Sequence, residues 1–211
     1  MNKNRDKIIL LSGFEAFGAF SSNPSALLAE KFDGLAIGPY RVRSCILPVV
    51  FGEASRILEE WINQLHPAVV VCLGQAAGRS GITPERIAVN LDDADIPDNA
   101  GNQPVEKAIV PGGPAAYWSG LPVSKIVSAL AALDIPASVS MSAGTYVCNH
   151  VFYSLMYKLA GMPGVRGGFV HIPLMEGQSP DDKPALSLHQ LEQAVRCVLK
   201  TSAQELEGAG F

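Results

Sequence analysis

The residue best placed for nucleophilic chemistry is Cys148, which ends the segment 140–148. This segment has the pattern of a short strand, a turn containing Gly144 and the start of a helix. The first turn of a helix has unpaired N–H groups and a partial positive charge, which stabilise a thiolate, lower its pKa and can stabilise an oxyanion. The competing interpretation is a buried, unreactive cysteine, which fits the other three cysteines well: Cys45, Cys72 and Cys197.

A thiol nucleophile needs a base, and His171 is the histidine best placed to act as one. It ends the apolar segment 167–170, so we expect it at the carboxyl end of a strand, as we do Cys148. The competing interpretation is a core histidine that hydrogen-bonds a backbone carbonyl. The remaining histidines are weaker candidates, because they lie at helix ends or point away from the thiol on the same helix: His66, His189 and His150.

A third group should orient the imidazole, and spacing alone leaves several candidates. Glu85 follows a glycine-rich loop that leaves an apolar strand, and Asn149 adjoins the nucleophile. The acidic set Asp92, Asp93, Asp95 and Asp98 competes with both. That set lacks the glycine and glutamate of a calcium loop, so a solvated turn is the better interpretation and no metal site is predicted. Neither a Walker-type phosphate loop nor a GxGxxG motif is present.

The composition predicts one folded domain spanning residues 1–211. Apolar residues make up 48% of the 211 residues and charged residues 17%, so the chain can bury a real core and is not disordered. A net charge of −4 argues against a nucleic-acid partner. The four cysteines form no CxxC pair, and the apolar run 8–11 is too short for a signal peptide or a membrane span. We therefore expect a cytoplasmic protein with no membrane partner and reduced thiols.

Strand-like and helix-like segments alternate along most of the chain. Strands are predicted at 7–12, 41–49, 68–73, 86–91, 137–141 and 168–172, and helices at 24–34, 52–65, 123–133, 149–160 and from 188 onward. Residues 68–73 lack polar alternation, which is typical of a sheet covered on both faces. The alternation predicts an α/β fold with a mainly parallel sheet between helices.

The chemistry-bearing residues fall at the expected strand ends, where open α/β sheets bind ligands. Five regions qualify: residues 13–17, 74–79, 92–98 and 142–148, and His171. Between Pro97 and Pro122 the periodic pattern disappears, so a long structureless connection is predicted there. Its Tyr117-Trp118 pair makes a contact between subunits a reasonable hypothesis.

Two long motifs surround the candidate catalytic residues. The first is Gly74-x-x-Ala77-x-x-x-x-Ile82-Thr83-Pro84-Glu85-Arg86-Ile87-Ala88-x-Asn90. The second is Ser140-x-Ser142-Ala143-Gly144-x-Tyr146-Val147-Cys148-Asn149. Shorter motifs accompany them in order along nearly the whole chain: Gly13-Phe14-x-x-Phe17-Gly18, Asn90-Leu91-Asp92-Asp93-Ala94, Ile96-Pro97-Asp98-Asn99 and His171-Ile172-Pro173. Together these motifs resemble those of the pyroglutamyl peptidase type I family of cysteine exopeptidases.

The resemblance implies Cys148 as nucleophile, His171 as base and then acid, and Glu85 as the group that orients His171. It implies a three-layer α/β/α sandwich around a mostly parallel, mixed sheet, no cofactor, and a homotetramer or homodimer. The implied substrates are peptides with an N-terminal pyroglutamate. The implied pocket consists of Phe14 and Phe17, with Gln75, Tyr146 and Val147 as its neighbours.

These residue types suit a neutral lactam. Pyroglutamate has no free α-amine, so its pocket needs flat apolar walls and a few hydrogen-bond partners. Backbone groups near Tyr146 and Val147 are candidates for bonding the lactam N–H and C=O, and they would reject proline, which lacks the ring carbonyl. The thiolate would form a thioester, and His171 would protonate the leaving amine before it activates water.

Two other functions remain as alternatives. One is another Cys-His-Glu amidohydrolase, but residues 147–149 are not the Gly-x-Cys-x-Gly turn typical of glutaminase-like enzymes. The other is an inactive relative that binds modified N-termini, against which the intact triad residues argue. Met141 and the pair Leu174-Met175 depart from the family pattern and concern the rim of the site.

Overall fold

An uninterrupted apolar strand forms the middle of the main sheet. In the computed structural model, which describes residues 7–178 and 183–208, this strand is β4 (Val69–Gln75), and six of its seven residues are buried. It pairs in parallel with β1 (Lys7–Phe14) on one side and with β8 (Arg166–Ile172) on the other. Both faces of β4 are covered by helices, as its lack of polar residues predicts.

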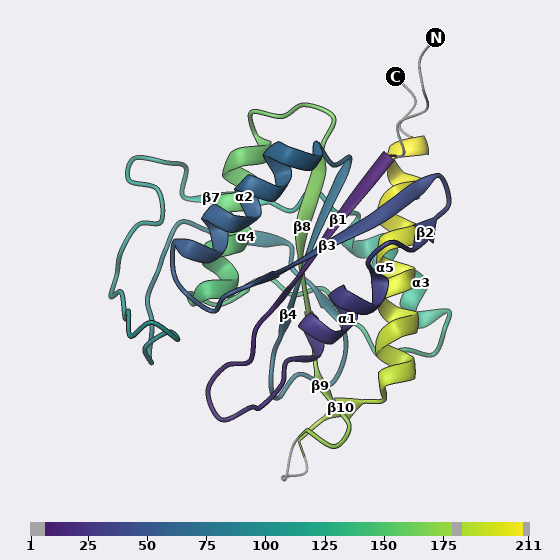
Figure 1. Cartoon of the computed structure of the whole chain (residues 1–211), viewed down its shortest axis with the longest axis horizontal. Coiled ribbons are helices and arrows are strands. Elements are labelled where there is room, and N and C mark those ends of the chain that lie inside the picture. Colours follow the sequence, from purple (N-terminus) through teal and green to yellow (C-terminus); the bar gives the residue numbers. More distant parts are fainter. Residues whose placement is uncertain (1–6, 179–182, 209–211) are drawn as a thin grey trace.

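Shorter strands complete a six-stranded sheet of order β2-β3-β1-β4-β8-β5. β3 (Tyr40–Leu47) runs parallel to β1, whereas β2 (Ala36–Ile37) and β5 (Thr83–Pro84) pair antiparallel at the two edges. The prediction of a mostly parallel, mixed sheet in a three-layer α/β/α sandwich is therefore confirmed (Figure 1).

The helices divide into two layers, one on each face of the sheet (Figure 1). α1 (Pro24–Phe32), α3 (Val123–Ala131) and α5 (Leu188–Gly208) pack on one face. α2 (Glu53–Leu65) and α4 (Val147–Leu159) pack on the other. The second layer matters for function, because Phe169 of β8, two residues before His171, packs in this layer with α4.

The predicted start of the first helix is confirmed in detail. Asn23 is the N-cap of α1, and its side-chain oxygen accepts a hydrogen bond from the N–H of Ser25 at 3.1 Å. Ser25 in turn accepts from the N–H of Phe14 at 2.9 Å. A Cβ on Gly13 would lie 2.2 Å from the Ser25 carbonyl oxygen, so only glycine allows α1 to approach β1 this closely. This contact places Phe14 at the sheet end.

Two predicted elements differ in the structure. The strand predicted at 86–91 is β6 (Ile87–Val89), which leaves the main sheet and pairs antiparallel with β7 (Ala116–Trp118). The connection at 97–122 is therefore not wholly structureless, since β7 lies within it. The strand predicted at 137–141 is wrong: that segment forms only isolated bridges, from Ala137 to Ile82 and from Ser140 to Glu85.

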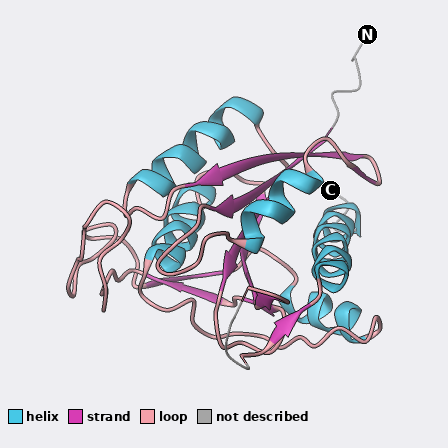
Figure 2. Cartoon of the chain, turned by 60° about the horizontal axis from the view of Figure 1, so that its bottom comes forward, coloured by secondary structure: helices cyan, strands magenta, loops and turns pink. Residues whose placement is uncertain are grey.

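A short parallel pair lies near the carboxyl end of β8. It consists of β9 (Leu174–Met175) and β10 (Ala185–Leu186), and it leads into α5 (Figure 2). Among the described residues, none of the helices is both long and apolar enough to cross a membrane.

Candidate active site

His171 lies near the carboxyl end of β8, on the face of the sheet that α4 covers. Its register partner on β4 is Gly74. The side chain of His171 is 5% exposed, and its Nδ1 lies 2.7 Å from Oε1 of Glu85. Because a carboxylate only accepts hydrogen bonds, Nδ1 donates and Nε2 is left as the basic nitrogen. The imidazole therefore has the tautomer that a general base requires.

Glu85 reaches His171 because it follows β5, which runs antiparallel to β8. The Glu85 N–H donates to the Phe169 carbonyl at 2.9 Å, which fixes the residue opposite β8. Its side chain is fully buried, and Oε1 also accepts from Nη1 of Arg79 at 2.7 Å. Oε2 is buried without a hydrogen-bond partner among the described residues. One carboxylate oxygen thus serves both the imidazole and a guanidinium.

Cys148 is the second residue of α4, so the helix begins two residues earlier than predicted. Its Sγ lies 3.1 Å from the point that a Cβ on Gly74 would occupy. The thiol therefore lies directly above Gly74, beside the β8 position that His171 occupies, and both side chains line the same cavity. The site predicted at the strand ends is assembled around a glycine that leaves room for sulfur.

The free thiol is not the thiolate that its helix position predicts. Burial and, second to it, the charge of Glu85 raise the pKa of Cys148 to about 12, although the charge of Arg79 acts to lower it. Burial lowers the pKa of His171, against the raising effect of Glu85. The expectation of a low thiol pKa is therefore wrong for the free protein, because burial outweighs the helix N-terminus. Cys148 and His171 are both neutral near pH 7 before substrate binds.

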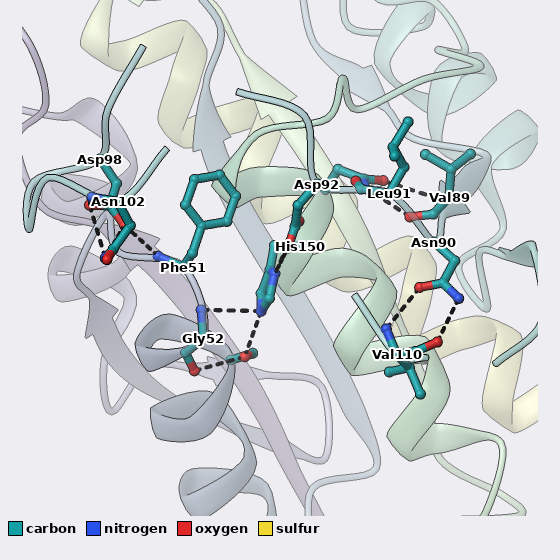
Figure 3. A network of polar contacts seen from close by, with 12 residues as sticks. Phe51, Gly52, Val89, Asn90, Leu91, Asp92, Asp98, Asn102, Val110 and His150 are labelled. Carbon is teal, nitrogen blue, oxygen red and sulfur yellow. Dashed lines mark hydrogen bonds and ion pairs between the residues drawn. The ribbon is translucent and has the colours of Figure 1, made fainter. Parts of the chain in front are cut away.

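The rival candidates for the third group are occupied elsewhere. Asp92 bonds His150 instead of His171, with 2.8 Å between Oδ2 and Nδ1 (Figure 3). The side chain of Asn149 is hydrogen-bonded to β6, since it accepts a hydrogen bond from the Val89 N–H and donates one to the Val89 carbonyl. Of the groups left open by spacing, Glu85 is the one the structure brings to His171.

The other acidic residues, histidines and cysteines also lie apart from His171 and Glu85. Asp98 accepts hydrogen bonds from the N–H groups of Phe51, Ala100 and Asn102, which hold its pKa below its ordinary value although burial acts to raise it (Figure 3). His66 and His189 are exposed. Cys45 and Cys72 are buried in the sheet. Within residues 7–178 and 183–208, His, Cys, Asp and Glu side chains form no group of three that could hold a metal ion.

A cavity of about 320 Å³ lies next to the thiol and the imidazole. This size suits a small ligand. All five predicted pocket residues line it, together with residues from four loops. The full lining is Phe14, Phe17, Phe20, Ser22, Asn23, Val49, Gln75, Ala77, Ala143, Tyr146, Val147, Cys148 and His171.

Aromatic rings form one wall of this cavity. Tyr146 packs against Phe17 with ring centroids 5.3 Å apart and against Phe51 at 5.2 Å. Its hydroxyl donates to the Pro97 carbonyl at 3.0 Å, which connects the wall to the long connection. Gln75 contributes the cavity's unsatisfied polar group, since its Oε1 is buried without a partner among the described residues. A ligand N–H would supply the missing donor.

The two departures from the family pattern do not line the cavity. Met141 is 58% exposed, and Leu174 is fully buried. Residues that sequence reasoning missed include Phe20 and Val49, which line the cavity, and Arg79, which holds Glu85. A single arginine six residues before a buried glutamate was the available signal for Arg79.

Comparison with known proteins gives consistent matches over nearly the whole chain. The family model for pyroglutamyl peptidase matches residues 7–205. The pyrrolidone-carboxylate peptidase of Escherichia fergusonii is 47% identical over 93% of this chain and 91% of its own length. The crystal structure of Bacillus amyloliquefaciens pyroglutamyl peptidase I superposes with a TM-score of 0.92 at 44% identity, over 95% of this chain and 98% of that one. Pyrrolidone carboxyl peptidase from Thermococcus litoralis gives 0.94 at 36% identity, over 97% and 96%.

Proposed function

The chain belongs to the pyroglutamyl peptidase family, and we propose that Cys148, His171 and Glu85 carry out its reaction, the removal of an N-terminal pyroglutamate from peptides. It is a cysteine peptidase. The observation that carries the assignment of residues is the 2.7 Å contact between Glu85 and His171, beside a thiol in the same cavity.

The neutral state of the free pair determines how the thiol is activated. As Cys148 Sγ attacks the acyl carbon of pyroglutamate, His171 Nε2 takes the thiol proton, and the carbonyl electron pair moves to oxygen. Glu85 stabilises the resulting imidazolium through Nδ1–H. N–H groups in the first turn of α4 have no partner within the helix, and they donate hydrogen bonds to the oxyanion.

Collapse of this intermediate breaks the bond to the leaving amine. The oxyanion electron pair re-forms the carbonyl, the C–N bond breaks, and His171 gives its proton to the amine of the shortened peptide. A thioester to Cys148 remains. His171 then takes a proton from water as the hydroxyl adds to the thioester, and returns it to sulfur as the C–S bond breaks. Free pyroglutamate leaves with the enzyme unchanged.

The cavity supports recognition of a lactam ring. Phe14 and Phe17 offer flat apolar walls, and the family motif around Tyr146 and Val147 borders the same space. We propose that the buried Oε1 of Gln75 accepts the lactam N–H, because this oxygen otherwise has no donor among the described residues. A prolyl substrate would leave the groups that meet the lactam carbonyl unpaired, and such a loss discriminates strongly.

The test is release of a fluorophore from a pyroglutamyl amide, with the prolyl amide as the substrate control. Under reducing conditions, we expect activity on the first substrate alone. Cys148→Ser should lower kcat by at least about a thousandfold, as removal of a nucleophile does. Cys197→Ser, which changes another partly buried thiol, should retain activity. Full activity in Cys148→Ser would overturn the assignment of the nucleophile.

We also propose that the peptidase works as a homo-oligomer, a tetramer or a dimer. The exposed aromatic residues near β7 support this, since Trp118 is 65% exposed and Tyr157 is 47% exposed. Such side chains are enriched in the cores of protein interfaces. Trp118→Ala should shift the sedimentation profile of the purified enzyme toward smaller species, and an unchanged profile would exclude Trp118 from the interface.

A further inference from the structure

Arg79 makes contacts that the proposed mechanism does not use. Its Nη1 lies 2.7 Å from Glu85 Oε1 and also donates to the Thr83 hydroxyl. Its Nη2 donates to the Ser142 carbonyl at 3.2 Å. The guanidinium therefore joins residues around β5 to the turn that leads into α4. No other described Arg or Lys makes an ion pair with Glu85.

These contacts converge on a single carboxylate oxygen. Glu85 Oε1 accepts from Arg79 on one side and from His171 Nδ1 on the other, both at 2.7 Å. The side chain of Glu85 is 0% exposed, whereas that of Arg79 is 28% exposed. A buried carboxylate without a cation beside it would be costly to keep ionised. A planar guanidinium can hold the carboxylate and a carbonyl at fixed angles, which a lysine cannot.

The charge of Arg79 also acts on both reacting groups. It lowers the pKa of Cys148 and that of His171, whereas Glu85 raises both. Cys72 and Tyr146 are the other titratable groups that interact with the thiol. Arg79 is thus the cation that offsets the effect of Glu85 on formation of the thiolate.

We propose that Arg79 is a positioning residue of this active site, which fixes Glu85, and through it the His171 ring, relative to the turn that carries Cys148. This inference rests on the function proposed above. It adds a fourth residue to the machinery, one that touches neither substrate nor the reacting atoms.

The decisive variant is Arg79→Met, which keeps side-chain length and removes the charge. Loss of a hydrogen bond between charged groups predicts a fall in kcat of about tenfold to a hundredfold. KM should change little, because Arg79 does not line the substrate cavity. Removing a cation favours proton binding by both reacting groups, so both limbs of the kcat/KM pH profile should move to higher pH. A merely structural arginine would leave these limbs in place.

Two further variants complete the design. Arg79→Lys keeps the positive charge but loses the planar guanidinium, which bonds Glu85 and Ser142 at once. It should therefore lower kcat, while the limbs of the kcat/KM pH profile stay near their wild-type positions. This variant also decides the matter if Arg79→Met does not fold. Arg56→Met is the matched control, since it breaks an exposed ion pair on α2, in which Arg56 lies 2.5 Å from Glu60. It should leave kcat and the limbs of the pH profile unchanged.

A readout without substrate separates this proposal from the proposed function. The rate at which iodoacetamide alkylates Cys148 should rise with pH, and in Arg79→Met that rise should occur at higher pH than in wild type. If wild type is inactive on the pyroglutamyl amide, the function fails, yet the alkylation profile still tests Arg79. Unchanged kcat, unshifted limbs and an unshifted alkylation profile in folded Arg79→Met would overturn the proposal.

Discussion

Gly74 is the residue on which the spacing of the candidate site depends. An added Cβ would lie 2.7 Å from the ring of Phe169 and 3.1 Å from Cys148 Sγ. The Phe169 ring is itself 4.8 Å from that of His171, between centroids. An added Cβ would therefore displace the Phe169 ring, which lies against the imidazole of His171. It would also displace the sulfur of Cys148, which is the nucleophile. In the sequence Gly74 only marks the end of a strand, but in the structure it constrains the positions of the reacting groups.

Gly74→Ala should fold with reduced stability and lose most of its activity. Overpacking of this kind costs about 1–3 kcal/mol, and a small displacement of reacting atoms costs about a hundredfold in rate. The measurements are kcat/KM on the pyroglutamyl amide and the urea midpoint. Gly161→Ala is the matched control, since its nearest neighbour would be 3.6 Å away. Wild-type kcat/KM in Gly74→Ala would show that the thiol has room to move.

Glu85→Gln should shift the pH profile in the direction opposite to that of Arg79→Met. Glu85 raises the pKa of both His171 and Cys148, so its neutralisation lowers both. The acid limb reports protonation of His171 and the alkaline limb reports loss of the thiol proton, so both should move to lower pH. kcat should also fall by about a hundredfold or more, because the imidazolium loses its counter-charge. A shift to higher pH would contradict the proposed electrostatics.

The candidate reactive residues could be selected from the sequence, whereas their protonation states could not. Cys148 and His171 could be selected because each follows a strand-like segment, and Glu85 could be selected only through the family motif. The raised pKa of Cys148 could not be foreseen, because it depends on burial in the folded chain and on the nearby charge of Glu85. Arg79 was missed because its spacing from Thr83 and Glu85 does not show that these side chains meet, and its third partner, Ser142, is distant in sequence.

At the scale of elements, a buried polar network connects α4 to the loops around the cavity (Figure 3). His150 on α4 donates from Nδ1 to Asp92, and its Nε2 accepts from the Gly52 N–H at 3.2 Å, just before α2. The ring of Phe51 packs edge-on against both His150 and Tyr146. The aromatic wall of the cavity is thus supported from behind by a hydrogen-bonded histidine.

His150→Ala should lower the free energy of unfolding by about 3 kcal/mol. The substitution leaves Asp92 buried without its partner and the Gly52 N–H without an acceptor, and breaking a buried pair is costly. Lys158→Met is the control on the same helix, since Lys158 pairs with Glu59 at 2.6 Å near the surface and should cost less than about 1 kcal/mol. Urea unfolding of both variants tests this, and equal losses would contradict it.

The main elements could be predicted because buried strands and amphipathic helices have distinct patterns. Residues 137–140 could not be assigned correctly from pattern alone. They run parallel to residues 82–85, with hydrogen bonds from Ser138 N–H to the Ile82 carbonyl and from Ser140 N–H to the Pro84 carbonyl. The ladder is interrupted at Pro84, which has no N–H to donate. A strand-like sequence thus remains a pair of isolated bridges because of a proline in its neighbour.

At the scale of the whole molecule, buried thiols couple stability to alkaline pH. Burial raises the pKa of Cys45 and of Cys72 from 9.0 to about 12. Above pH 9 the unfolded chain therefore releases protons that the folded chain retains. Their contribution to stability is complete below pH 9 and is lost as pH rises from 9 toward 12.

Replacing both thiols should make the protein less sensitive to alkali. In the double variant Cys45→Ala/Cys72→Ala, the fall in unfolding free energy between pH 9 and 11 should be less steep than in wild type. Each thiol contributes at most about 1.4 kcal/mol per pH unit. Cys197→Ala, which removes a less buried thiol, should change the steepness less. Parallel curves for wild type and the double variant would exclude these thiols as the cause.

The arrangement of strands also governs when the enzyme becomes active as it folds. β4 pairs with β8 across about a hundred residues of sequence, and β5 pairs with the same strand. Contacts this distant in sequence form slowly, because a long loop must close before they are made. His171 lies on β8, so it reaches Glu85 and Cys148 only when β8 docks, although α4 can form earlier from local contacts. During refolding, catalytic activity should therefore return later than helical circular dichroism, so peptidase activity itself reports the last step of assembly.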